Sequence, residues 1–262
     1  MRKIETYERF HRHLAAWVDR EIESLMVSGR GGVGKSRAYQ TALGNRPYHR
    51  LGGRQTPLQV YNTLHDAPDR PIVLDDISAL LKDDNFRDLL KSICETGERV
   101  VHWGSTTSRL EGRSHSFICT SPVLIVLNRI PGRDADVAAI LDRFDAVEFA
   151  PTKNEIIARM RCIFPEEQNL INLIADLPAL PSLRTLVKAR QWKRSRHLSL
   201  TEELLAECGV PEPVSHLAQI IESFPDSEWC QEYVKRTGLT DRTYRRHKPL
   251  ARQLVEARKS AK

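Results

Sequence analysis

Short apolar runs alternate with amphipathic stretches between residues 25 and 151 of this chain. The apolar runs predict strands, and apolar residues at a helical spacing predict the helices between them. Such an alternation is typical of a parallel sheet with helices on both faces. The continuous run Val123 to Leu127 fits a strand that is buried on both sides. The expected strands are 25–28, 48–51, 71–76, 99–103, 123–128 and 146–149, and the expected helices are 7–18, 35–43, 57–65, 84–96 and 135–144.

Beyond Pro151 the strand pattern stops and the spacing becomes helical throughout. Helices are expected over 154–162, 166–177, 182–193, 201–208 and 214–224, followed by a last group of two or three helices. We therefore predict four parts: an N-terminal helical segment (1–24), an α/β core (25–151), a small helical lid (152–210) and a C-terminal basic helical module (211–262).

The glycine-rich segment 29–36 lies between the first core strand and the next helix, and it matches the phosphate-binding pattern G-x-x-x-x-G-K-[ST]. Its glycines let the backbone curl around a phosphate, Lys35 can reach the β and γ oxygens, and the Ser36 hydroxyl can bind Mg²⁺. We therefore predict ATP and Mg²⁺ as cofactors. The expected nucleotide-binding residues are Gly29, Arg30, Gly31, Gly32, Val33, Gly34, Lys35 and Ser36.

Polar side chains at two strand ends complete the expected site. Asp75 ends an apolar strand about 40 residues after the loop, where a carboxylate can organise Mg²⁺ beside Ser36. Asp76 follows it and can orient the attacking water. Asn128 ends the buried strand 123–127 and is expected to sense the γ-phosphate, although a turn-forming Asn is the alternative.

Two arginines are further candidates for the phosphates. Arg143 ends the helix 135–144 and could enter the site of a neighbouring subunit, while Arg184 opens a helix of the lid. For each of them a surface ion pair is the alternative.

These spacings resemble the AAA+ ATPase family, and the resemblance covers roughly Leu25 to Arg196. It implies Walker A at 29–36, Walker B at Asp75 and Asp76, sensor 1 at Asn128, an arginine finger at Arg143 and sensor 2 at Arg184. The segments 52–57, 73–77, 89–91 and 101–104 look more narrowly like AAA+ ATPases of phages and mobile elements. Most members have Glu after the Walker B Asp, so Asp76 puts the hydrolysis rate in doubt.

A competing resemblance concerns the loop alone. Arg30 to Ser36 looks like the deviant loop of the ParA/MinD partition ATPases, with Arg30 where that family has a signature Lys. Those proteins begin their chains with the loop, and they lack the Asn-tipped strand and the helical lid.

Charge and composition limit the classes of partner that this protein can bind. The net charge is +6, and residues 181–262 hold 16 Lys and Arg against 10 Asp and Glu, so the rest of the chain is neutral. A basic tail on a neutral body indicates a polyanionic partner, although a solvated helical face is the alternative. No apolar run approaches the ~20 residues that cross a bilayer, and the five cysteines form no metal or disulfide pattern. We expect a cytoplasmic protein without membrane contact.

Two segments carry the DNA prediction. The polar stretch 104–116 could form a hairpin with Arg109 and Arg113 facing phosphates, or an ordinary surface loop. The tail predicts a helix over 229–234, a turn with Gly238, a second helix over 241–248 and a third from Pro249, as in a helix-turn-helix. A generic basic bundle is the alternative. The expected DNA contacts of the tail are Arg242, Arg245, Arg246 and Lys248.

The function expected from these features is an AAA+ ATPase that assembles or moves on DNA during mobile-element replication or transposition. We expect a homo-oligomer, a ring or filament, with other replication or transposition proteins as further partners. A helicase, a helicase loader and a transposition regulator all share this architecture. The alternatives are a signalling or defence ATPase whose tail binds a protein partner, and a small-molecule kinase.

Overall fold

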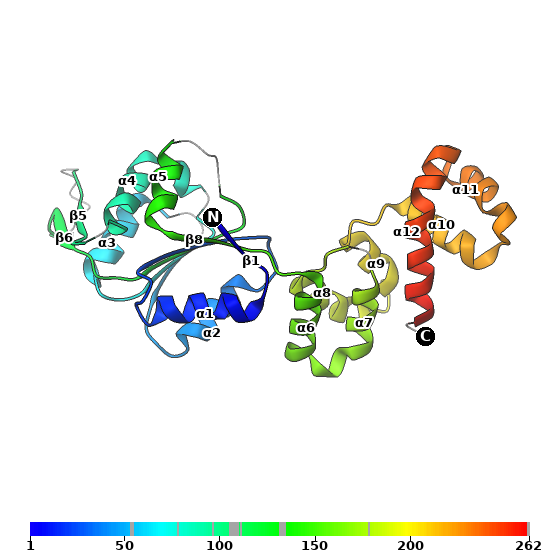
Figure 1. Cartoon of the computed structure of the whole chain (residues 1–262), viewed down its shortest axis with the longest axis horizontal. Helices are drawn as coiled ribbons and strands as arrows, with labels where there is room; N and C mark the ends of the chain where they lie inside the picture. Colours follow the sequence, from blue (N-terminus) through cyan, green and yellow to red (C-terminus); the bar gives the residue numbers. More distant parts are fainter. Residues whose placement is uncertain are drawn as a thin grey trace. The chain divides into compact units, whose positions relative to one another are not determined.

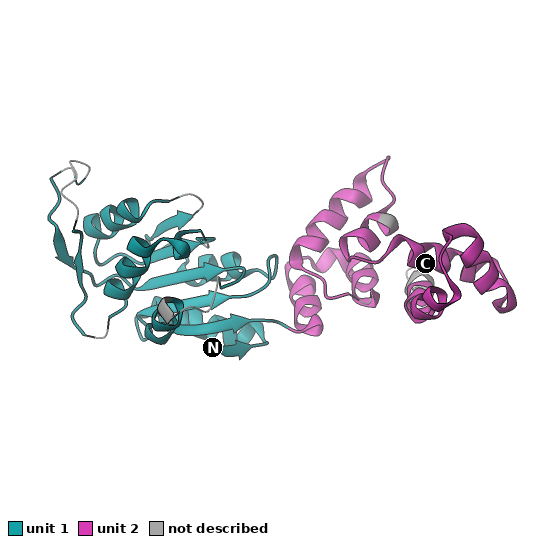
Figure 2. Cartoon of the chain, turned by 90° about the horizontal axis from the view of Figure 1, so that it is seen from above, with its two compact units in different colours: residues 1–151 teal, residues 152–262 magenta. Residues whose placement is uncertain are grey.

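The computed structural model describes residues 1–52, 55–77, 79–95, 97–104, 110, 112–130, 135–177 and 179–260. The chain divides into two compact units, Met1–Pro151 and Thr152–Lys262, shown in different colours in Figure 2. Each unit is described by itself below. Within the described part of the chain, no helix is long and apolar enough to span a membrane.

The first unit is built on a six-stranded sheet in the order β1-β8-β2-β7-β4-β3. All neighbouring strands in it are parallel, and every residue of β2, β4 and β7 is buried. Burial on both faces explains why these strands read as continuous apolar runs in the sequence. The strands are β1 (Arg2–Ile4), β2 (Ser24–Ser28), β3 (His49–Gly52), β4 (Ile72–Asp75), β7 (Val123–Leu127) and β8 (Asp145–Phe149).

Helices cover both faces of this sheet, as the sequence predicts. Figure 1 shows α1 (Tyr7–Val18) and α2 (Lys35–Leu43) on one face, and α3 (Pro57–Asp66), α4 (Asp84–Ile93) and α5 (Ala135–Arg143) on the other. A short 3-10 turn, η1 (Leu80–Lys82), precedes α4. The start of α3 follows from its sequence, because Thr56 and Gln59 form a reciprocal capping box and Pro57 takes the first helical position. The predicted α/β fold class is therefore confirmed.

The strand predicted at 99–103 does not join the main sheet. It forms β5 (Val100–His102), which pairs antiparallel with β6 (Ser116–Ile118) in a separate two-stranded hairpin. Val100 and His102 are exposed while Val101 is buried, so the strand alternates as a one-sided strand does. The strand β1 was missed, because it has three residues and only Ile4 of them is buried.

The second unit is helical. In it α8 packs against α6, α7 and α9, and α12 packs against α7, α10 and α11. The helix predicted to begin at Pro249 is wrong, because α12 runs through this proline. The helices of the second unit are α6 (Lys153–Ile163), α7 (Gln168–Asp176), α8 (Leu183–Arg194), α9 (Leu200–Glu207), α10 (Glu212–Ser223), α11 (Trp229–Thr237) and α12 (Asp241–Ser260), with the 3-10 turns η3 (Pro165–Glu167) and η4 (Asp226–Glu228).

Candidate functional site

The phosphate loop lies between the end of β2 and the start of α2, at the carboxyl edge of the main sheet. Its shape depends on glycine at two positions. A Cβ built on Gly29 would lie 2.2 Å from the carbonyl oxygen of Phe149 in β8, so only glycine fits there. Gly34 caps α2 in the left-handed conformation, with φ of 91°. The backbone amides at the start of α2 therefore face the loop, where a helix binds anions.

Lys35 lies buried across this loop. Its Nζ donates to the carbonyl oxygens of Gly29 at 2.6 Å and Arg30 at 2.9 Å, and to Oδ1 of Asn128 at 3.2 Å. Asn128 directly follows β7, which pairs with β2. The structure thus brings the two predicted residues together and fixes the ammonium group where a polyphosphate would contact the loop.

Asp75 at the end of β4 gathers three donors on one oxygen. Its Oδ2 accepts from Ser36 Oγ at 3.1 Å, from the Tyr39 hydroxyl at 3.0 Å and from Arg50 Nη2 at 3.0 Å. Burial, followed by the charge of Asp75, raises the pKa of Tyr39, so this phenol stays protonated and donates. Ser36 and Asp75 were expected to lie side by side, and they do.

Asp76 is exposed and has a left-handed backbone, with φ of 59°. Such a conformation is uncommon for residues other than glycine, although Asp and Asn adopt it more readily than others. The Asp76 N–H donates to the carbonyl oxygen of Val126 at 3.0 Å, which ties this turn to the end of β7. The carboxylate is therefore held at the same edge of the sheet as Asn128 and the loop.

Strand order decides how these groups meet. The Asn-tipped strand β7 lies between the loop strand β2 and the acidic strand β4, so three strand ends share one edge of a parallel sheet. A helical unit follows this core in the chain. The core therefore has the parallel α/β fold with a glycine-rich loop at its carboxyl edge that the sequence predicts.

No protein-family model matches the chain. Over 152 residues it is 26% identical to an uncharacterised 36.7 kDa protein from the nrdC–mobD intergenic region of Enterobacteria phage T4. That alignment covers 54% of this chain and 44% of the phage protein, so the chain spans less than half the length of this relative.

Solved structures with a similar arrangement include two mutants of Thermotoga maritima RuvB, with TM-scores of 0.48 and 0.47 at 15% and 14% identity. The two alignments cover 91% and 90% of this chain, and 84% and 82% of the respective RuvB chains. NtrX from Brucella abortus in complex with ATP has a TM-score of 0.46 at 11% identity, and covers 97% of this chain and 69% of its own.

The residues at this edge of the sheet fit Mg²⁺ delivered together with a nucleotide. Ser36 and Asp75 supply hard oxygen ligands close together, and Mg²⁺ commonly uses one or two protein ligands plus phosphate oxygens and waters. Among the described residues there is no group of three or more His, Cys, Asp and Glu that could hold a metal ion. Within the part of the chain that the structure describes, Ser36 and Asp75 would therefore share Mg²⁺ with the phosphates, which would complete the coordination.

The two predicted arginines lie in different units. Arg143 ends α5 on the surface, where its Nε lies 3.4 Å from Oε2 of Glu95 and its Nη1 donates to the carbonyl oxygen of Ala139. Arg184 is exposed in the first turn of α8, in the second unit. Their roles as arginine finger and sensor 2 stay predictions.

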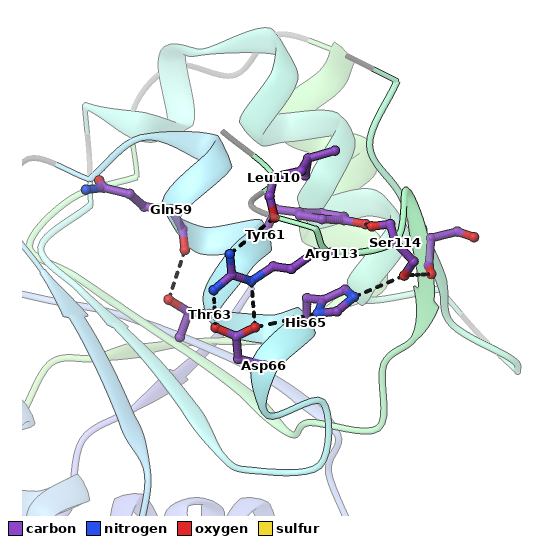
Figure 3. Close-up of polar contacts among 9 residues, drawn as sticks. Gln59, Tyr61, Thr63, His65, Asp66, Leu110, Arg113 and Ser114 are labelled. Atoms are coloured by element: carbon purple, nitrogen blue, oxygen red, sulfur yellow. Dashed lines mark hydrogen bonds and ion pairs between the residues drawn. The ribbon is translucent and has the colours of Figure 1, made fainter. Parts of the chain in front are cut away.

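The polar stretch 104–116 joins β5 and β6, and Arg109 falls outside the described residues. Arg113 binds Asp66 at the end of α3 with two hydrogen bonds, Nε to Oδ1 at 2.6 Å and Nη2 to Oδ2 at 2.7 Å (Figure 3). Tyr61 and His65 of α3 also hydrogen-bond to Ser114 (Figure 3). Arg113 thus anchors the hairpin to α3, and contact with a phosphate would require this pair to open.

In the tail, α11, a turn at Gly238 and α12 follow one another as predicted. Arg242, Arg245 and Arg246 are exposed near the start of α12. The ammonium group of Lys248 already has partners in the tail. Its Nζ lies 5.1 Å from the centre of the Trp229 ring and 3.5 Å from Oδ1 of Asp226. His247 contacts α11 from the same helix, since its Nδ1 lies 2.8 Å from the hydroxyl of buried Tyr233.

Sequence reasoning missed three residues at this site. Arg50 and Tyr39 contact Asp75, and the hydroxyl of buried Tyr7 donates to the carbonyl oxygen of Val33 inside the phosphate loop at 2.9 Å. None belongs to a motif. The one available signal was periodicity, which places Tyr7 on the apolar face of α1 and Tyr39 on that of α2.

Proposed function

We propose that this protein binds ATP with Mg²⁺ and hydrolyses it. The observation that carries this proposal is the meeting of Lys35, Ser36, Asp75 and Asn128 at one edge of the sheet. Each of these groups suits one part of phosphoryl transfer, which depends on positioning and on stabilisation of negative charge. No other polar cluster in the described chain lies beside a glycine-shaped phosphate loop.

The residues would divide the work by their chemistry. Lys35 and the loop amides would hold the β and γ phosphates, and Ser36 and Asp75 would hold Mg²⁺, which would neutralise charge on the phosphate oxygens. Asp76 acts as the general base that orients the lytic water, and Asn128 hydrogen-bonds the γ-phosphate. Arg143 of a neighbouring subunit and Arg184 of the lid would complete the site.

The test compares Lys35→Ala with Lys3→Ala, a surface change in the same unit. Lys35→Ala is expected to reduce turnover by about a hundredfold or more, because it removes the cation that faces the γ-phosphate. Nucleotide affinity is measured with a fluorescent ATP analogue, and hydrolysis by phosphate release. Lys3→Ala should leave both unchanged. Equal turnover in the two variants would mean that the loop is misread.

We further propose that the ATP cycle drives assembly or movement on DNA, as in mobile-element replication or transposition. Residues 229–262 hold 10 Lys and Arg against 3 Asp and Glu, which supports a polyanionic partner for α11 and α12. Arg242, Arg245 and Arg246 have the i, i+3, i+4 spacing of one helix face, and Tyr244 is buried on the other side. This face can meet DNA phosphates without unpacking the module.

DNA affinity should fall when Arg245 and Arg246 are both replaced by Ala, while basal ATP hydrolysis stays unchanged. If both side chains contact phosphates, the slope of log K against log salt becomes shallower by up to about 2. The matched control is Arg194→Ala with Arg196→Ala, which removes the same charge from the end of α8 and the segment after it. Equal affinity of the two double variants for single- and double-stranded DNA would favour a protein partner for the tail.

A further inference from the structure

Arg50 stands out because its guanidinium reaches the proposed metal site from an edge strand. It lies in β3, which pairs only with β4 in the sheet order. Its Nη2 lies 3.0 Å from Oδ2 of Asp75, and its side chain is 54% exposed while that of Asp75 is 10% exposed. The pair therefore joins a largely exposed cation to a nearly buried carboxylate.

The same oxygen is the one that faces Ser36. Oδ2 of Asp75 accepts from the Ser36 hydroxyl at 3.1 Å and from the Tyr39 hydroxyl at 3.0 Å, in addition to Arg50. An oxygen with three donors, one of which is a neutralising guanidinium, has little remaining capacity for another cation. In this arrangement a divalent ion that used Ser36 and Asp75 would compete with Arg50 for one atom and would be repelled by its charge.

The described residues leave Arg50 largely exposed in that position. With more than half of its side chain exposed, the guanidinium can leave Asp75 without opening the core. The triphosphate would bring negative charge to the same edge of the sheet and would offset the repulsion between the two cations. Free divalent ions bring no such negative charge, so the repulsion by Arg50 opposes their binding in full.

We propose that Arg50 is a built-in counter-cation that occupies Asp75 in the nucleotide-free protein and makes metal binding conditional on the triphosphate. This inference rests on the proposed function, because it assigns the control of metal loading to that same site. Arg50 acts here as a positioning residue. It sets the order of binding, so that metal arrives with nucleotide and the empty site does not collect free ions.

The experiment measures binding of Mn²⁺ alone to the full chain, by the loss of its free electron-paramagnetic-resonance signal, without nucleotide. Arg50→Gln is expected to bind Mn²⁺ at least about tenfold more tightly than the unmodified protein, because one positive charge has left the ligand. The matched control is Arg46→Gln, since Arg46 is 55% exposed and pairs with Asp19 away from the site. It should leave Mn²⁺ affinity unchanged.

A second variant keeps the test decisive. Arg50→Lys retains the charge and is expected to bind free Mn²⁺ as weakly as the unmodified protein. Unchanged or weaker Mn²⁺ binding by Arg50→Gln would overturn the proposal and would make Arg50 a support for Asp75. A separate titration with a non-hydrolysable ATP analogue distinguishes failure of the proposed function from failure of the role proposed for Arg50. If the unmodified protein takes up no nucleotide, the proposed function fails, whereas the Mn²⁺ comparison alone decides the role of Arg50.

Discussion

Asp76 combines an exposed carboxylate with a backbone conformation that few side chains adopt. Its φ of 59° places it in the left-handed region, which Asp and Asn tolerate because their short side chains bond locally. The AAA+ resemblance implies Glu at this position. A Glu side chain is less suited than Asp to this left-handed backbone. The turn that directs this residue toward the phosphate edge thus gives a local reason for Asp.

Asp76→Asn is therefore a clean test of the general base. Asn has nearly the same shape and accepts a left-handed backbone, so the turn should persist while proton acceptance is lost. We expect ATP binding to remain, hydrolysis to fall by about 10²-fold or more, and ATP-bound assemblies to accumulate. Phosphate release and native mass measurements follow these changes, with Asp142→Asn as the surface control. Normal hydrolysis would remove Asp76 from this role.

The residues of the loop could be predicted from the sequence because a motif fixes both their type and their spacing. The contacts of Arg50 and Tyr39 could not, because each depends on which strand lies beside β4 and on the register of that pair. An arginine in a short edge strand looks like any solvated cation in the sequence. Tyr7 shows the same limit, since periodicity predicts its burial but not the carbonyl oxygen that its hydroxyl meets.

At the scale of elements, long periodic segments were predicted well and short ones were not. The helix predicted over 35–43 matches α2, and the buried run at 123–128 matches β7 to within one residue. β5 was assigned to the wrong sheet, because three residues do not reveal their partner and the neighbouring strand β6 was not recognised. α12 passes through Pro249 although proline interrupts a helical hydrogen bond, since Ala251, Leu254 and Val255 beyond it are buried.

The contact between α11 and α12 should depend on pH through His247. Burial, followed by the charge of Arg246, lowers the pKa of His247, whose Nδ1 lies 2.8 Å from the Tyr233 hydroxyl. A lowered pKa in the folded state means that the unfolded state binds the proton more tightly. The neutral ring thus stabilises the fold above the unfolded pKa of about 6.5, and this stabilisation is lost as the pH falls below it.

Hydrogen exchange of the α11 and α12 amides in the full chain measures this effect. Between pH ~7.5 and ~5.5, protection corrected for intrinsic exchange should fall in the unmodified protein and fall less in His247→Gln, which does not titrate. His216→Gln, on a partly exposed position of α10, serves as the matched control and should follow the unmodified protein. Equal pH dependence in all three would show that His247 does not control this contact.

At the scale of the whole molecule, the position of Arg143 bears on assembly. It ends α5 at the surface, and its ion pair with Glu95 has a length of 3.4 Å with both side chains partly exposed. An exposed pair of this kind contributes little to stability, so Arg143 can exchange Glu95 for another anion at low cost. The phosphate site of a second copy of this chain would supply such an anion, and its stabilisation of the transition state would be large.

Mixing two inactive variants tests this contribution directly. Arg143→Ala keeps its own phosphate loop but lends no guanidinium, whereas Lys35→Ala has a disabled loop and still carries Arg143. Each alone should hydrolyse ATP about 10³-fold more slowly than the unmodified protein, and a mixture should recover activity wherever a Lys35→Ala subunit faces an Arg143→Ala site. Activity is measured by phosphate release across mixing ratios, and mass by light scattering with a non-hydrolysable ATP analogue.

Glu95→Ala, which frees Arg143 without removing it, should remain active. A monomeric Arg143→Ala protein with normal turnover would instead favour a small-molecule kinase, because such an enzyme needs no guanidinium from a second copy.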